Sequence, residues 1–386
     1  MSLFTFIGLA LGIVFGLCFK DLTGYTEFIG QYYITALKFL IVPVIFTSIS
    51  VSIFKSRNQK NGLIVKTVLL FIIMFTVSFL LSSLVVTIMN PSKGFSVEGI
   101  TYEGDVTDFS IKDIFLNLIP KDAYKFFTGG YLFFVIIVSI IVGYVSSLFA
   151  FGEKIINVID CIKEILYKVL GYLNYVTPFA VFSLISVTVA KYGSILLGVG
   201  LKYILTAFVS SLVILVVVMI LPVLVITKMS PVTFIKKVYR IWLMTISTCS
   251  SSATLPYTIK LCKEELNIPD SITDVVVPLG CTIHMCGGAV SFSLLGLFCL
   301  KLYGIHITFG VYLLMLVYAL LINMSAPGIP NGGVVIGASY LGLLGIPLDF
   351  IGFYSGIYKI LDMMYTTLNV TGDITANVIL NEISKD

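Results

Sequence analysis

Four polar side chains near the end of the chain share one face of a predicted helix. They are Asp362, Thr366, Asn369 and Asp373, at offsets i, i+4, i+7 and i+11. With 3.6 residues per turn, this spacing places them in one stripe. The surrounding residues are aliphatic and aromatic, which favours a membrane helix over a cytoplasmic amphipathic tail. An ionised carboxylate at membrane depth costs roughly 2.5–3.5 kcal/mol on insertion scales. The two aspartates therefore predict a counter-charge, which could be a cation, a ligand amine or a proton.

Two other polar segments interrupt short apolar runs, at 248–256 and 325–333. Backbone without regular helix is tolerated at membrane depth only where protein covers it or where it lines a wet cavity. Two such breaks in one chain are typical of the binding site of a transporter. We therefore predict two re-entrant hairpins, with ordinary loops between short helices as the alternative.

The first break carries three consecutive serines, Ser250, Ser251 and Ser252. A half-helix that begins there directs its positive end and its free N–H groups at an anion. A substrate carboxylate is the natural occupant. The sequence thus suggests a zwitterionic ligand, with its carboxylate at the serine tip and its amine at Asp362.

A third polar segment, at 278–288, predicts an unwound helix because it contains Gly280, Gly287 and Gly288. His284 lies within it, either as a protonatable group near the site or as a buried, neutral, hydrogen-bonded side chain. A metal centre of Cys281, His284 and Cys286 is not expected, because their spacing fits no common zinc pattern.

The composition indicates the environment in which these segments lie. Of 386 residues, 58% are hydrophobic and 11% are charged, whereas soluble domains carry about 25% charged residues. A net charge of +4 without a basic cluster interleaved with aromatics gives no reason to expect nucleic acid as a partner. The seven cysteines are scattered, and we interpret them as small buried residues without a disulfide framework.

A helix that crosses a bilayer needs roughly 20 apolar residues. Runs of this kind precede the first break, at about 3–19, 34–54, 67–89, 130–150, 167–189 and 195–227. The connecting segments 54–66 and 228–240 are rich in Lys and Arg, which places them in the cytoplasm together with the N-terminus. The first run lacks a basic leader and a cleavage site, so we expect a retained span and no signal peptide.

Several motifs together resemble the dicarboxylate/amino acid:cation symporter family, which includes the glutamate transporters. They are SSSATLPYT (250–258), PLGCTIHMCGG (278–288), GIPNGG (328–333) and DMMYTTLNVTGD (362–373). The resemblance runs nearly end to end. It implies an all-α polytopic membrane protein with eight transmembrane helices, two re-entrant helical hairpins and inverted repeats. It also implies a homotrimer and an elevator mechanism.

The resemblance implies the following division. Residues 1–66 would form scaffold helices 1–2, residues 67–90 transport-domain helix 3, and residues 91–190 scaffold helices 4–5 with an extracellular loop. Residues 191–386 would complete the transport domain with helix 6, hairpin 1 (about 241–270), helix 7 (about 273–303), hairpin 2 (about 307–346) and helix 8 (about 349–380). The serine tip would be approached from the cytoplasmic side, and the second tip would be the extracellular gate.

The resemblance also implies the site residues. Substrate would meet Ser250, Ser251, Ser252, Thr282, Gly328, Pro330, Asp362, Tyr365, Thr366 and Asn369. A first sodium ion would be held by Gly280, Asn369 and Asp373, and a second by Thr282, Asn323, Met324 and Ala326.

The chain departs from the family pattern at several of these positions. Family members read Asn-Met-Asp-Gly-Thr where this chain has His-Met-Cys-Gly-Gly at 284–288, and that aspartate binds a further sodium ion. A thiol such as Cys286 cannot replace a hard oxygen ligand. Tyr365 stands where transporters of acidic amino acids have an arginine, and Tyr358 stands at another aspartate position.

We therefore expect a secondary active symporter that carries an amino acid with a neutral side chain into the cell. Sodium is the expected coupling ion, and protons, with His284 as a carrier, are the alternative. Acidic amino acids or C4-dicarboxylates remain alternative substrates. An anion channel is a different class, although a channel needs no occluding hairpins.

An enzyme is not expected. An intramembrane hydrolase using Ser251, His284 and Asp362 would need a nucleophile motif such as G-x-S-x-G, which the chain lacks. The expected partners are the amino acid and membrane lipid, without a cofactor. The expected location is the plasma membrane, as a multi-pass protein with both termini cytoplasmic; the compact loops suit a prokaryotic inner membrane.

Overall fold

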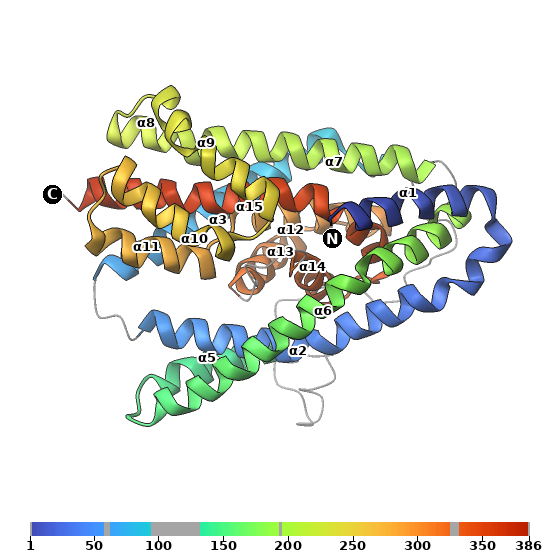
Figure 1. Cartoon of the computed structure of the whole chain (residues 1–386), viewed down its shortest axis with the longest axis horizontal. Helices are drawn as coiled ribbons and strands as arrows, with labels where there is room; N and C mark the ends of the chain where they lie inside the picture. Colours follow the sequence, from blue (N-terminus) through green and yellow to red (C-terminus); the bar gives the residue numbers. More distant parts are fainter. Residues whose placement is uncertain (1, 58–61, 94–131, 193–194, 325–331, 385–386) are drawn as a thin grey trace.

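The computed structural model describes residues 2–57, 62–93, 132–192, 195–324 and 332–384 (Figure 1). These residues form helices and turns, and no strand occurs among them. In chain order the elements are α1 (Ser2–Cys18), η1 (Lys20–Tyr25), α2 (Glu27–Arg57), α3 (Gly62–Met89), α5 (Leu132–Ser146), α6 (Gly152–Tyr192), α7 (Ile195–Ile214), η3 (Leu215–Ile220), α8 (Leu221–Thr227), α9 (Pro231–Thr248), α10 (Ser251–Lys260), η4 (Leu261–Glu265), α11 (Asp270–Ile283), α12 (Cys286–Leu302), α13 (Phe309–Asn323), α14 (Gly332–Leu343) and α15 (Asp349–Ile383).

Three helical stretches are long and apolar enough to cross a bilayer: Gly62–Met89, Gly198–Thr227 and Asp270–Leu302. A fourth candidate is a bent pair, Gly152–Leu173 with Tyr175–Ala190. The helical, apolar chain is thus a multi-pass membrane protein, as predicted. The division into eight spans and two hairpins stays a prediction. Most of the expected extracellular loop falls on residues 94–131, outside the described part.

Helix α6 packs against α1 and α2, and α2 packs against α5 (Figure 1). Contact between α1 and α6 depends on three glycines at four-residue intervals. A Cβ atom at Gly12 would lie 2.8 Å from the Phe182 carbonyl oxygen, and one at Gly16 would lie 2.5 Å from that of Ser186; Gly8 meets the Pro178 carbonyl in the same way. Such small-residue stripes let two backbones approach closely in a membrane, where lipid offers no hydrophobic drive for association.

The bend in α6 has a local cause. Its two halves differ in direction by 53° at the break between Leu173 and Tyr175. Pro178 has no N–H to bond the carbonyl four residues earlier, and its ring crowds that carbonyl. The proline therefore bends the helix where the missing hydrogen bond would be.

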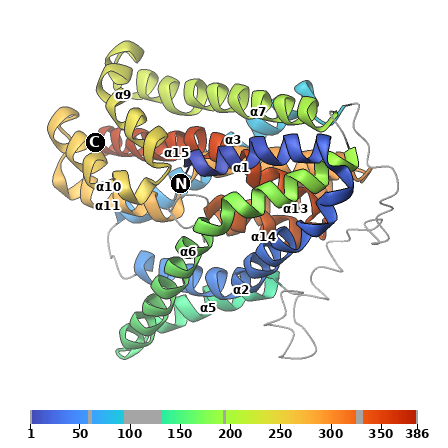
Figure 2. The ribbon, with the colours of Figure 1, turned by 45° about the vertical axis from the view of Figure 1, so that its right-hand side comes forward.

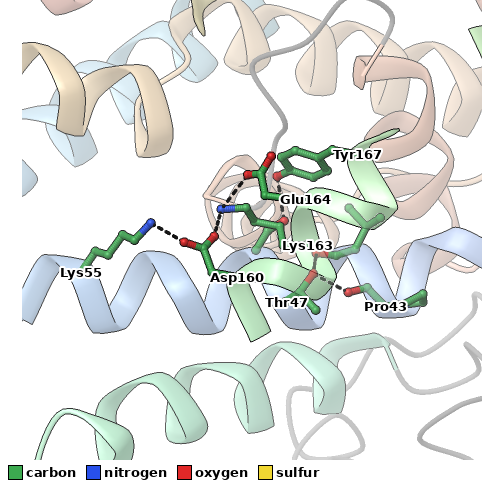
Figure 3. A network of polar contacts seen from close by, with 9 residues as sticks. Pro43, Thr47, Lys55, Asp160, Lys163, Glu164 and Tyr167 are labelled. Atoms are coloured by element: carbon green, nitrogen blue, oxygen red, sulfur yellow. Dashed lines mark hydrogen bonds and ion pairs between the residues drawn. The ribbon is translucent and has the colours of Figure 1, made fainter. Parts of the chain in front are cut away.

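A polar network joins α2 to α6 at the surface (Figure 3). Asp160 pairs with Lys55 of α2, at 2.8 Å, and with Lys163 on its own helix. Beyond it, the Tyr167 hydroxyl lies 2.8 Å from Ser48 Oγ. Because Lys55 and Asp160 are exposed in part, we expect the pair to fix the register of the helices more than to stabilise the fold.

Helices α12 and α15 form the centre of the molecule. In both ribbon views they lie between α7–α9 on one side and α2, α5 and α6 on the other (Figures 1 and 2). Helix α12 is buried along nearly its whole length and contacts α3, α7, α13, α14 and α15. Helix α15 contacts α9, α10, α11 and α12. The helices that carry the predicted site residues thus converge on one core.

Candidate functional site

The polar stripe of α15 faces the protein interior, as its spacing predicts. The exposed fractions of Asp362, Thr366, Asn369 and Asp373 are 6%, 4%, 8% and 1%. Thr366 Oγ1 donates to Asp362 Oδ1 at 3.3 Å. The side-chain amide oxygen Oδ1 of Asn369 accepts a hydrogen bond of 2.7 Å from the backbone N–H of Gly287, in the first turn of α12. Each side chain of the stripe is therefore held within the core.

The serine tip joins two antiparallel helices. Helix α9 ends at Thr248, and its C-cap residue, Cys249, adopts a left-handed conformation with φ +49°, which is uncommon for a residue with a side chain. Ser250 then caps α10, and its Oγ accepts a hydrogen bond of 3.2 Å from Ala253 N–H. Ser251 is buried, whereas Ser252 is exposed and lies 3.9 Å from the Cys281 thiol. The strained residue and the cap together direct the start of α10 toward α15.

The predicted unwound segment is a break between α11 and α12. His284 and Met285 separate the two helices; the backbone of His284 is extended, and α12 begins at Cys286. A Cβ atom at Gly287 would lie 2.5 Å from Tyr365 Cα, so only glycine lets α12 begin this close to α15. The break presents the first N–H groups of α12 to the polar stripe.

His284 is the centre of a buried network. Its Nδ1 lies 2.9 Å from Asp373 Oδ1, and its Nε2 lies 3.0 Å from the Cys286 thiol. The ring stacks on Phe71 of α3, with centroids 4.3 Å apart. Gly372 makes room for the ring, because a Cβ atom there would lie 2.6 Å from His284 Cε1. The imidazole is therefore buried and hydrogen-bonded, and it fixes one oxygen of a predicted sodium ligand.

The predicted second sodium site is only partly described. Asn323, at the end of α13, is buried, and its amide donates to the Ile283 carbonyl at 3.3 Å. Met324 follows it as the helix C-cap. The Thr282 side chain is exposed, and its hydroxyl donates to the Leu279 carbonyl of its own helix at 2.8 Å. Three predicted residues of the second tip, Ala326, Gly328 and Pro330, lie outside the described residues.

Five of the predicted substrate residues line one cavity of about 40 Å³: Ser251, Asp362, Tyr365, Thr366 and Asn369. The other residues of its lining are Cys249, Met285, Gly288, Ser291, Phe292, Gly333, Ile336 and Tyr358. This volume can hold water, but small-molecule pockets are typically about 300–1,000 Å³. An amino acid therefore needs these walls to move apart before it can enter.

Sequence reasoning missed two residues, a buried lysine on α15 and a cysteine that lines the cavity. Lys359 is 6% exposed although it carries an ammonium group, and it precedes Asp362 by three positions on α15. Cys249 lines the cavity. The rule that an ionisable residue within a membrane segment is a functional candidate could have singled out Lys359.

Comparison with known proteins identifies the family of this chain. A model described as the sodium:dicarboxylate symporter family matches residues 1–383. The proton/sodium-glutamate symport protein of Bacillus subtilis (strain 168) is 25% identical over 98% of this chain and 91% of its own length. The proton/glutamate-aspartate symporter of Escherichia coli (strain K12) is 27% identical over 91% of this chain and 83% of its own. The C4-dicarboxylate transport protein of Deinococcus radiodurans is 24% identical, with 97% and 87% covered. These relatives are named as transporters, not as enzymes. Together with the buried polar stripe and its two broken helices, the match establishes that this chain belongs to the sodium:dicarboxylate symporter family.

Proposed function

We propose that this protein is a secondary active transporter that carries an amino acid into the cell together with a cation. The proposal depends on one observation: Asp362 of α15 and Ser251 of the serine tip line the same cavity. A buried carboxylate beside the start of a helix supplies both signs of charge that a zwitterion needs. Membership of a symporter family is consistent with this function.

The two ends of the zwitterion have separate partners in this proposal. The first turn of α10 has N–H groups that the helix cannot pair internally, and Ser250 Oγ accepts one of them, from Ala253. The positive end of α10 favours the substrate carboxylate, with Ser251, Ser252 and Asn369 as further donors. Asp362 is the proposed partner of the amino group.

A neutral side chain suits the part of the cavity wall that Tyr358 and Tyr365 form. Tyr365 is 2% exposed, and its hydroxyl has no hydrogen-bond partner among the described residues. Its ring lies 6.4 Å from that of Tyr358, and Phe292 and Ile336 complete an uncharged lining. A second carboxylate buried against this wall would lack a counter-charge, which is costly. An acidic amino acid or a C4-dicarboxylate is the alternative, which the names of the relatives favour.

Sodium is the proposed coupling ion, held by Asp373, Asn369 and the backbone of Gly280. Asp373 Oδ1 is engaged by His284, and Asn369 Oδ1 by Gly287 N–H. A carboxylate has about four lone-pair sites and an amide oxygen has two, so both side chains retain capacity for a hard cation. Proton coupling with His284 as the carrier is the alternative. For a second sodium ion, Thr282 would have to reorient beside Asn323.

We further propose that the protein works as a homotrimer in the plasma membrane, with both termini cytoplasmic and an elevator motion. In this proposal α1, α2, α5 and α6 form the scaffold. The helices around α12 and α15 form the transport domain and carry the cavity. The packing of α6 against both α1 and α2, and of α2 against α5, is consistent with this division.

The proposal is tested by purifying the protein and screening the twenty common amino acids, succinate and malate for thermal stabilisation. The screen is run in sodium and in choline, at two pH values. A ligand that binds the folded state raises Tm by mass action. A neutral amino acid that stabilises only with sodium supports the proposal. Stabilisation by glutamate, aspartate or a dicarboxylate alone contradicts the proposed side-chain specificity.

A further inference from the structure

The polar face of α15 continues beyond Asp373. Asn377 and Asn381 follow it at intervals of four residues, so the three side chains lie one above another along the helix. Asn369 lines the small cavity of the proposed substrate site, whereas Asn381 lines a second cavity, of about 770 Å³. Along the helix, Asp373 and Asn377 separate the two cavities, and both side chains are buried.

The second cavity lies between the end of α15, the beginning of α11 and the segment before α11. Its lining includes four polar side chains, those of Asn267, Ser271, Asn381 and Ser384. Asn267 and Ser271 are exposed, so water reaches the cavity. Ser384 is the C-cap of α15, and Figure 1 shows this end of the helix beside α11. The cavity therefore lies on the side of the C-terminus, which we have proposed to be the cytoplasm.

Asn377 is a buried amide of which one end is occupied. Its exposed fraction is 0%, as is that of Thr273 on α11. Asn377 Nδ2 donates to Thr273 Oγ1 at 3.1 Å, which fixes the orientation of the amide. The Oδ1 atom has no hydrogen-bond partner among the described residues. A buried acceptor without a partner is unfavourable, so Asn377 Oδ1 indicates an occupant that these residues do not supply.

The neighbours of Asn377 favour a cation as this occupant. Asp373 lies one turn earlier on α15, a rise of about 6 Å, and its carboxylate attracts cations. On α11, Gly280 lies against Asp373 and Thr273 against Asn377. Amide and carboxylate oxygens are ligands that hard cations accept. We propose that Asn377 is a second binding station for the coupling cation, which passes from Asp373 over Asn377 Oδ1 into the cytoplasmic cavity.

This inference deepens the proposed function, because the choice of sodium and of the cytoplasmic side rests on it. An ion leaves a chain of sites only if no site holds it too tightly. Asp373 offers a full negative charge and Asn377 a neutral oxygen, so the affinity falls toward the cytoplasm. Val276, between Gly280 and Thr273 on the same face of α11, is also wholly buried, so the path is closed in this conformation.

The test changes one oxygen atom on the path. Asn377→Thr keeps a hydroxyl group, and Asn377→Val replaces that hydroxyl by a methyl group of similar size. Thr375→Val makes the same exchange elsewhere on α15, because Thr375 is wholly buried and its hydroxyl has no partner among the described residues. Two residues correspond to about 200° of rotation, so Thr375 lies away from the polar face.

The measurements use the purified full-length protein and sodium, without a substrate. Equilibrium binding of radioactive sodium gives Kd. Stopped-flow fluorescence of Trp242, the only tryptophan of the chain, gives the association and dissociation rates. Its Nε1 donates to Thr371 of α15 at 2.9 Å, two residues from Asp373. Rapid filtration of bound radioactive sodium measures the dissociation rate independently.

Asn377→Val should lower both rates about tenfold or more relative to Asn377→Thr, because the ion crosses the same step in both directions without an oxygen ligand. The Kd values of the two variants should differ by less than about threefold, because the resting site at Asp373 is unchanged. Thr375→Val should keep both rates within about twofold of the parent protein.

Equal rates in Asn377→Thr and Asn377→Val overturn the proposal, since the station would then hold water or nothing. A Kd that rises with the dissociation rate alone, or equal slowing in Thr375→Val, overturns it as well. If Asn377→Val does not fold, Asn377→Leu, closer to asparagine in size, takes its place. A parent protein that binds no sodium rejects the proposed coupling ion, whereas sodium binding with equal rates rejects only the station at Asn377.

Discussion

Replacing Gly287 by alanine tests whether the site depends on close contact between α12 and α15. A Cβ atom at Gly287 would lie 2.5 Å from Tyr365 Cα and 2.6 Å from its carbonyl carbon, and it would also meet the carbonyl oxygen. These are backbone atoms in the middle of α15, so they cannot turn aside as a flexible side chain could. The beginning of α12 must therefore move away, which breaks the 2.7 Å bond from Gly287 N–H to Asn369 Oδ1.

The cost of Gly287→Ala has two parts. Forcing an extra methyl group into a packed core costs about 1–3 kcal/mol, and loss of a buried hydrogen bond adds about 1 kcal/mol. We expect a destabilisation of about 2–4 kcal/mol from these two effects. Gly198→Ala is the matched control, because a Cβ atom at this helical position meets nothing within 4 Å. That change should be neutral or slightly stabilising.

The assay is thermal unfolding of the purified variants in one detergent, followed by substrate-induced stabilisation. Gly287→Ala should unfold several degrees below the parent protein and lose its response to ligand, whereas Gly198→Ala should retain both properties. A Gly287→Ala protein with the stability and ligand response of Gly198→Ala would refute the argument that this contact builds the site.

Four further predictions concern the charges and the scaffold. Asp362→Asn should weaken substrate binding about 30-fold or more, because the buried partner of the amine is lost, while Tm without ligand stays close to that of the parent; direct binding measurements would check both. Asp373→Asn should abolish the effect of sodium on substrate binding, measured as the difference in Kd between sodium and choline. Asp160→Ala should change the free energy of unfolding by less than about 1 kcal/mol, because its ion pair with Lys55 is exposed in part. Gly12→Leu should lower the free energy of unfolding by several kcal/mol, because α1 and α6 could then no longer pack in contact.

The helices and the polar stripe could be predicted because their signals are local. The spacing of Asp362 and Asn369 defines a face on any helix, and the serines at 250–252 mark a cap wherever an apolar run resumes after them. The break at His284 was predictable for the same reason, since the glycines around it disfavour continuous helix. Family resemblance added the expected ligands of each residue, which remain proposals.

The contacts between distant segments could not be predicted from spacing. His284 meets Asp373 across 89 positions of sequence, and its imidazole stacks on Phe71 of α3. The sequence predicts a counter-charge outside the protein for each aspartate, as a cation, an amine or a proton. For Asp373 the structure brings a basic side chain of the protein itself into contact, that of His284.

Symport of an amino acid is tested most directly by measuring uptake into proteoliposomes of a radiolabelled amino acid that the thermal screen has selected. We predict uptake that saturates, exceeds equilibrium only under an inward sodium gradient and is lost in Asp362→Asn. Uptake driven by a proton gradient without sodium would contradict the proposed coupling ion. Flux that never exceeds equilibrium, shows no counterflow and survives Asp362→Asn would contradict symport itself.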